Sequence, residues 1–142
     1  MSELSPHLKD AIREVKERLI HTYPKLSEKI KKIKIDTAKE MVGPAAGAAA
    51  TQMITIQPDF ANRAPHKFLC SVLAHEFGHA LGKSLISPKT LDAGFATEYR
   101  ADYLSAQLFG ADTMKHALEY ALKVYPLKDK MHKDKVNERL DS

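Results

Sequence analysis

Two histidines and a glutamate stand together in the segment HEFGH, residues 75–79. On a helix, positions four apart differ by roughly 40° in direction, so the imidazoles of His75 and His79 project side by side toward one ion. Imidazole is a good zinc ligand, and a catalytic zinc site uses three protein ligands and leaves a fourth position for water. Glu76 is then placed to take the proton of that water and pass it to a leaving amine, while the metal polarises a carbonyl.

The residues around this segment favour a buried helix. The stretch VLAHEFGHALG, residues 72–82, is otherwise mostly apolar, whereas polar positions on an exposed helix face are the alternative interpretation. A cation and a water would satisfy the three polar groups inside such a helix. Gly78 costs about 1 kcal/mol relative to alanine within a helix, which indicates a close approach that needs the missing side chain.

The third ligand distinguishes the classes of zinc peptidase. In the pattern HExxHxxGxxH a third histidine follows, but that position is Leu85 here, so the metzincin pattern fails. The segment TEYRADYLSAQLFG supplies Glu98 early in the next predicted helix, with Asp102 one turn later on the same face. The Asp102 carboxylate would accept the free ring N–H of a ligand histidine and fix its tautomer. Two solvated acids on one helix face are the alternative.

The two motifs together resemble the gluzincin metallopeptidases. EYRADYLSAQLFG, residues 98–110, is especially similar to the glutamate helix of the HtpX-like and CAAX prenyl protease-like family. Those relatives are membrane-embedded, so this chain looks more like a minimal soluble member, a minigluzincin. The resemblance covers about residues 50–125 and implies zinc bound by His75, His79 and Glu98. It also implies Glu76 as general base and acid, with Asp102 beside a ligand histidine.

The resemblance further assigns the segment TQMITIQ, residues 51–57, to an edge strand that lines the cleft. An extended substrate would add to this strand through backbone hydrogen bonds. An ordinary core strand is an equal alternative. Such proteases usually carry an Asn-Ala pair before this strand, whereas this chain has GPAAGAAA at residues 43–50.

Stabilising the transition state requires a further donor directed at the oxyanion. In the membrane relatives a His-Pro pair followed by arginine supplies such groups. HKDKVNERL resembles that segment, with His132 and Arg139, but it lacks the proline and is one residue longer. His116 and Tyr103 are alternatives, although a plain packing or surface role is favoured for each.

Periodicity and turn-forming residues predict a single α+β domain over residues 1–142, mainly helical with a small sheet, and the resemblance implies that this domain is zincin-like. A helix over 5–23, capped by Ser5, is expected to pack on a catalytic part at 31–125, which a tail at 126–142 follows. The other predicted elements are strands at 31–36 and 51–57, a loop through 43–50, helices at 65–82, 96–109 and 112–124, and a short helix near Val136. Cys70 is expected to be a small core residue, and His66 carries no interpretable signal.

Composition excludes some classes of protein. The net charge of +4 comes from 22 basic and 18 acidic residues spread along the chain, which gives little support for nucleic-acid binding. One cysteine excludes an internal disulfide framework. The sequence has neither a secretory signal nor an apolar run of about 20 residues, so we expect a soluble, cytoplasmic protein without membrane insertion.

The leading hypothesis is a zinc-dependent endopeptidase that acts on extended peptide or unfolded protein. The charged tail from Lys128 onward is expected to keep it latent by lying across the cleft. The alternative is a catalytically silent metal-binding module with a regulatory or peptide-binding role. Histidine and carboxylate ligands suit zinc best, with cobalt, manganese and iron as other possibilities.

Overall fold

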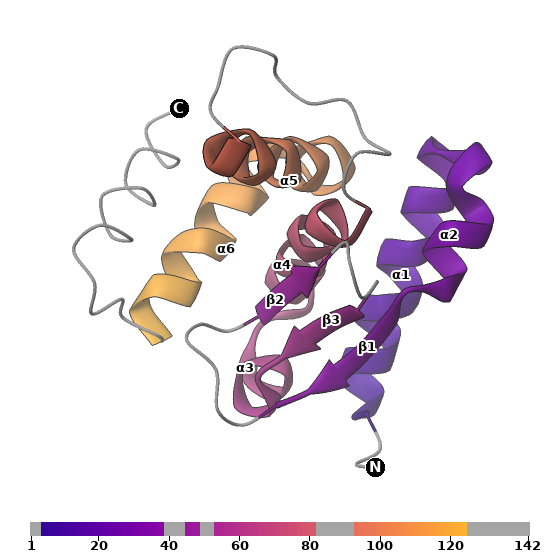
Figure 1. The fold of residues 1–142 in the computed structure, drawn as a ribbon. Coiled ribbons are helices and arrows are strands. Elements are labelled where there is room, and N and C mark those ends of the chain that lie inside the picture. The colour runs from indigo at the N-terminus through magenta and orange to yellow at the C-terminus, as the bar shows by residue number, and fades with distance from the viewer. Residues whose placement is uncertain (1–3, 39–44, 49–52, 82–92, 125–142) are drawn as a thin grey trace.

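A computed structural model describes residues 4–38, 45–48, 53–81 and 93–124 of the chain (Figure 1). This part of the protein is mainly helical with a small sheet, which confirms the coarse fold class. Its elements, in chain order, are α1 (Pro6–Thr22), the 3₁₀ turn η1 (Pro24–Leu26), α2 (Ser27–Lys32), β1 (Lys34–Thr37), β2 (Ala45–Ala48), β3 (Met53–Ile56), α3 (Pro58–Arg63), α4 (His66–Leu81), α5 (Ala93–Phe109) and α6 (Ala111–Val124).

The first helix begins as its sequence predicts. The Ser5 hydroxyl accepts a hydrogen bond from the backbone N–H of Leu8 at 3.2 Å, and proline occupies the first helical turn. Leu8, Val15 and Leu19 recur at helical spacing and are fully buried. Because this apolar face packs against α4, the N-terminal helix shares one hydrophobic core with the rest of the described chain.

The sheet corrects two expectations. Its strand order is β1-β3-β2, with β1 parallel and β2 antiparallel to β3. The predicted loop at 43–50 therefore contains a strand, because backbone pairing with β3 outweighs the weak strand preference of alanine and glycine. The strand predicted at 51–57 is β3, and it is the central strand rather than an edge. Hydrogen bonding on both sides occupies the backbone that was expected to receive substrate.

Short helices account for the remaining differences around the sheet. Residues that were expected to open the first strand belong instead to α2, so β1 starts at Lys34. Pro58 follows β3 directly and occupies the first turn of α3, a short helix that the sequence did not predict. The side chain of Gln57 accepts a hydrogen bond from the backbone N–H of Phe60 at 2.9 Å and caps that helix.

The three long C-terminal helices follow their predicted ranges closely. The structure ends α5 at Gly110, whose φ of +93° lies in the left-handed region where glycine is favoured, as expected for a helix C-terminus. The N–H of Gly110 bonds to the carbonyl of Ala106 at 2.8 Å and completes the last turn. The tail at 126–142 and the helix expected near Val136 lie outside the described residues.

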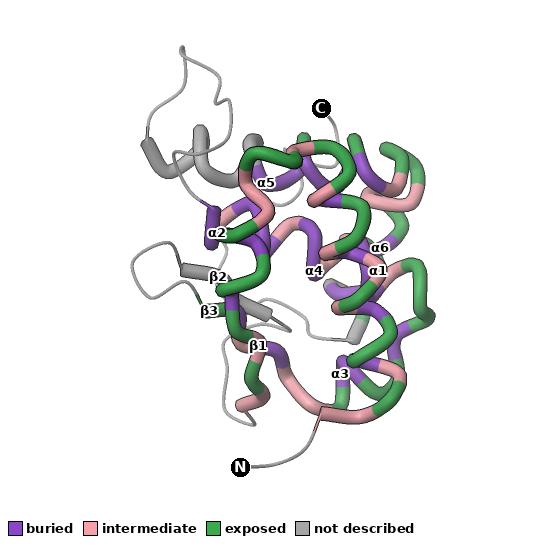
Figure 2. Tube along the Cα trace, turned by 90° about the vertical axis from the view of Figure 1, so that its right-hand side faces the viewer, coloured by how far each residue is buried: buried purple, intermediate pink, exposed green. Residues whose placement is uncertain are grey.

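Helix α4 is the centre of the molecule. It contacts α1, α5 and α6 as well as strands β2 and β3, and Figure 1 shows it between the sheet and the α5–α6 pair. In Figure 2 most of α4 is buried, whereas α1 alternates between buried and exposed positions. Polar side chains on α4 are therefore held in place by packing from several directions.

Among the described residues, no helix has the length and apolar character needed to cross a membrane.

Candidate metal centre

Helices α4 and α5 approach each other closely at Gly78. A Cβ atom added there would lie 2.7 Å from the Cα of Ala101 and 3.0 Å from its Cβ, both too short for ordinary contact. This confirms that Gly78 marks a close approach that only a residue without a side chain permits. The crossing fixes the separation of the two helices at the level of the histidines.

A buried serine pair fixes the register of the same two helices. The hydroxyl of Ser105 donates to the carbonyl of Ser71 at 2.9 Å, and the two hydroxyl oxygens lie 2.6 Å apart. Since the Ser105 proton is used in that bond, Ser71 is the donor between the hydroxyls. Both side chains are nearly inaccessible to solvent, so these bonds satisfy polar groups that water cannot reach.

One turn further along α4, His75 contacts Asp102. The ring Nδ1 of His75 lies 2.9 Å from Oδ1 of Asp102, and the two side chains are 14% and 9% exposed. An N–H at Nδ1 donates to the carboxylate, which leaves the lone pair of the imidazole on Nε2. The contact is the one that the four-residue spacing of Glu98 and Asp102 led us to expect.

The two histidines of α4 direct the same ring atom toward each other. Nε2 of His75 and Nε2 of His79 are 3.2 Å apart, with the rings inclined at 74°. Two nitrogens bound to one tetrahedral zinc at 2.0–2.1 Å would be separated by about 3.3 Å. One ligand atom from each of His75, Glu76 and His79 lies within 4.8 Å of the others, so this group can hold a metal ion. Glu76 is buried, with 7% of its surface exposed.

The structure does not place all of the other predicted site residues beside His75 and His79. Glu98 lies in α5, four positions before Asp102, and its side chain is outside the described part of the chain. Its role as the third ligand remains a prediction. His132 and Arg139, expected near the oxyanion, also lie outside the described residues.

The two alternatives for the oxyanion donor are surface residues. Tyr103 is 63% exposed, and His116 is exposed on α6. Neither side chain is held in the buried surroundings that give a hydrogen bond to a developing charge most of its strength.

A second group of potential ligands was missed by sequence reasoning. Glu14, His66 and Cys70 each offer a ligand atom within 4.8 Å of the others. Burial, reinforced by the nearby Glu14 carboxylate, raises the pKa of the Cys70 thiol to about 12, so without a metal this thiol is protonated. The four-residue spacing of His66 and Cys70 was the available signal, but Glu14 comes from α1 and no local pattern connects it to them.

The chain matches no protein-family model, no curated protein and no solved structure. A function therefore has to be argued from the chemistry of these side chains.

Proposed function

We propose that this protein is a zinc-dependent endopeptidase of the gluzincin type. The observation that carries the proposal is the 3.2 Å separation of the His75 and His79 Nε2 atoms, with Asp102 bonded to the far side of the His75 ring. A carboxylate behind a ligand histidine orients the ring and raises its basicity, an arrangement typical of zinc sites. Packing alone does not require this combination in a helix as buried as α4.

The metal would be held by His75, His79 and Glu98. The serine pair and the His75–Asp102 pair are consistent with antiparallel α4 and α5, because a later residue on one helix meets an earlier one on the other. One turn forward along α4 leads from His75 to His79, and one turn back along α5 leads from Asp102 to Glu98. Position 98 is therefore the place on α5 from which a carboxylate would complete the ligand set.

When bound, zinc would polarise the scissile carbonyl and lower the pKa of a water molecule at the open coordination position. Glu76 does the proton chemistry: its carboxylate accepts a proton from the attacking water and donates it to the departing amine nitrogen. Its buried position, with a carboxylate oxygen within 4.8 Å of ligand atoms of His75 and His79, supports this role.

The substrate would be an extended peptide or an unfolded protein segment. Strand β2 ends the order β1-β3-β2 and lies against α4, so its outer edge is adjacent to the helix that carries the histidines. A peptide that adds to this edge gains backbone hydrogen bonds without any requirement for a particular sequence. The docking strand is therefore β2 rather than the segment expected from the sequence.

Hydrolysis of a casein-type substrate by the zinc-loaded chain tests the proposal. We expect cleavage that stops on chelation and in Glu76→Gln, although this variant retains zinc because the substitution leaves the three ligands in place. The assay is run on the full chain and on a chain ending at Pro126, with faster cleavage by the shorter chain expected if the tail causes latency. Zinc content without hydrolysis at either length would refute the proposal and favour a silent metal-binding module.

A further inference from the structure

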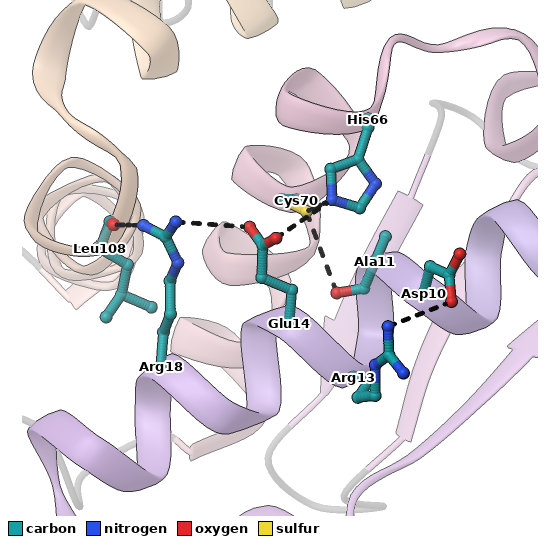
Figure 3. A network of polar contacts seen from close by, with 8 residues as sticks. All are labelled: Asp10, Ala11, Arg13, Glu14, Arg18, His66, Cys70 and Leu108. Carbon is teal, nitrogen blue, oxygen red and sulfur yellow. Dashed lines mark hydrogen bonds and ion pairs between the residues drawn. The ribbon is translucent and has the colours of Figure 1, made fainter.

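A compact polar cluster joins α1 to the beginning of α4 (Figure 3). Nε2 of His66 lies 3.3 Å from Oε1 of Glu14 and 3.5 Å from the sulfur of Cys70. The sulfur is also 4.0 Å from the carbonyl oxygen of Ala11 on α1. His75, in contrast, contacts α5 through Asp102, so the two groups of ligands on α4 have different partners.

The two distances from His66 agree with those around a bound zinc ion. In a tetrahedral site with Zn–N and Zn–O near 2.0 Å and Zn–S near 2.3 Å, the nitrogen would be about 3.3 Å from the oxygen and about 3.5 Å from the sulfur. The distance of each ligand atom from the others stays within 4.8 Å, so small side-chain adjustments would bring all three to one ion.

The surroundings also suit a cation. One carboxylate oxygen of Glu14 faces His66, while the other lies 3.5 Å from Nη2 of Arg18. Arg18 is held in turn by a 2.7 Å hydrogen bond from Nη1 to the carbonyl of Leu108. This chain of contacts fixes the carboxylate so that one oxygen is directed at the cluster, as groups behind metal ligands commonly do. Thiolate and carboxylate together would neutralise a divalent charge.

Access to the cluster is open on one side. The side chains of His66 and Glu14 are 43% and 37% exposed, whereas Cys70 is buried beneath them. A cation could therefore enter from solvent and keep a water molecule as a fourth ligand, with the sulfur at the base of the site.

We propose that Glu14, His66 and Cys70 form a second zinc-binding site, which cross-links α1 to α4. Binding replaces the thiol proton with the metal, so one proton is released and a thiolate–metal bond forms. Because the metal would tie two packed helices together, its binding should stabilise the folded chain. The proposal is independent of the peptidase function, because none of its ligands belongs to the His75 group.

Cobalt provides a specific test because the chain has one cysteine. Thiolate bound to Co²⁺ gives an intense charge-transfer band in the near ultraviolet, and the site at His75 and His79 has no sulfur ligand. We expect the full chain to bind two equivalents of Co²⁺ with this band. Zn²⁺ should displace the cobalt and abolish the band. His79→Ala should lose one equivalent and keep the band.

Variants in the cluster complete the test. His66→Ala alters a partly exposed side chain, so the protein should fold normally while it loses both the band and one equivalent of metal; Cys70→Ser should behave in the same way. His7→Ala is the matched control, because its ring packs against His66 but its Nε2 is bonded to the carbonyl of Ala64 at 2.8 Å. Absence of the band in the full chain, or its persistence in His66→Ala, would overturn the proposal.

Discussion

Replacing Gly78 with alanine perturbs the helix crossing that sets the geometry of the proposed metal centre. The new Cβ would lie 2.7 Å from the Cα of Ala101, a backbone atom that cannot rotate away. Favourable carbon–carbon contacts start near 3.5 Å, so α4 and α5 must separate locally by roughly 0.8 Å. Alanine gains about 1 kcal/mol in helix propensity, whereas overpacking costs about 1–3 kcal/mol, so we expect a net loss of up to about 2 kcal/mol in the free energy of unfolding.

The same separation affects metal binding. A shift of roughly 0.8 Å along the His75–Asp102 contact, now 2.9 Å, would take it to about 3.7 Å, beyond hydrogen-bonding distance. Loss of the group behind a ligand histidine lowers metal affinity by about 10- to 100-fold. Gly78→Ala should therefore weaken zinc binding even though position 78 supplies no ligand.

Competition with a chromophoric chelator measures that affinity, and urea unfolding measures the stability. Both are done in a Cys70→Ser background, so that only the His75 group binds zinc. Gly110→Ala is the matched control: its φ of +93° makes alanine unfavourable by about 1–2 kcal/mol, but a Cβ there meets no atom within 4 Å. The control should lose stability and keep its zinc affinity. Zinc affinity in Gly78→Ala within twofold of the parent protein would refute the reasoning.

Three further predictions concern single side chains. Asp102→Asn should lower zinc affinity by about 10- to 100-fold in the same competition assay, and an unchanged affinity would contradict the role of Asp102 behind His75. Ser105→Ala should lower the urea-unfolding free energy by about 1–3 kcal/mol, because it leaves the buried hydroxyl of Ser71 without its acceptor; no loss would contradict the hydrogen-bond assignment. Because burial raises the pKa of the Cys70 thiol from 9.0 to about 12, the folded state holds the proton more tightly. Chelator-treated wild type should therefore lose stability relative to Cys70→Ala as the pH rises from 9 to 12, and parallel stability curves would contradict that shift.

Local signals predicted the helices well. Capping by Ser5, the recurrence of buried leucine and valine in α1, and Gly110 at the end of α5 all act within a few residues of the chain. The contact at Gly78 was also accessible to sequence reasoning, because an interior glycine in a buried helix requires a neighbour that needs the space.

Features that depend on a distant partner could not be read in the same way. Strand β2 consists only of alanine and glycine, so no side-chain alternation marks it, and pairing with β3 determines its conformation. That pairing also makes β3 central, which the sequence of β3 does not reveal. The proposed cross-link between α1 and α4 is a similar case, because Glu14 and His66 are separated by 52 residues and meet only through helix packing.

The candidate site also has a part that depends on local sequence and a part that depends on a distant partner. His75 and His79 lie one turn apart on one helix, so local helical geometry is enough to place their rings side by side, with the Nε2 atoms 3.2 Å apart in the structure. The contact between His75 and Asp102 needs the crossing of two helices and could be anticipated only from the spacing of acids on the second helix.

Zinc analysis of three proteins tests the central claim, that side chains from α4 and α5 together hold one metal ion. In the Cys70→Ser background, the parent protein should contain one zinc per chain, and His79→Ala and Glu98→Ala should contain none. Circular dichroism checks that each variant is folded. Full zinc content in Glu98→Ala would contradict the claim, because the third ligand would then lie elsewhere.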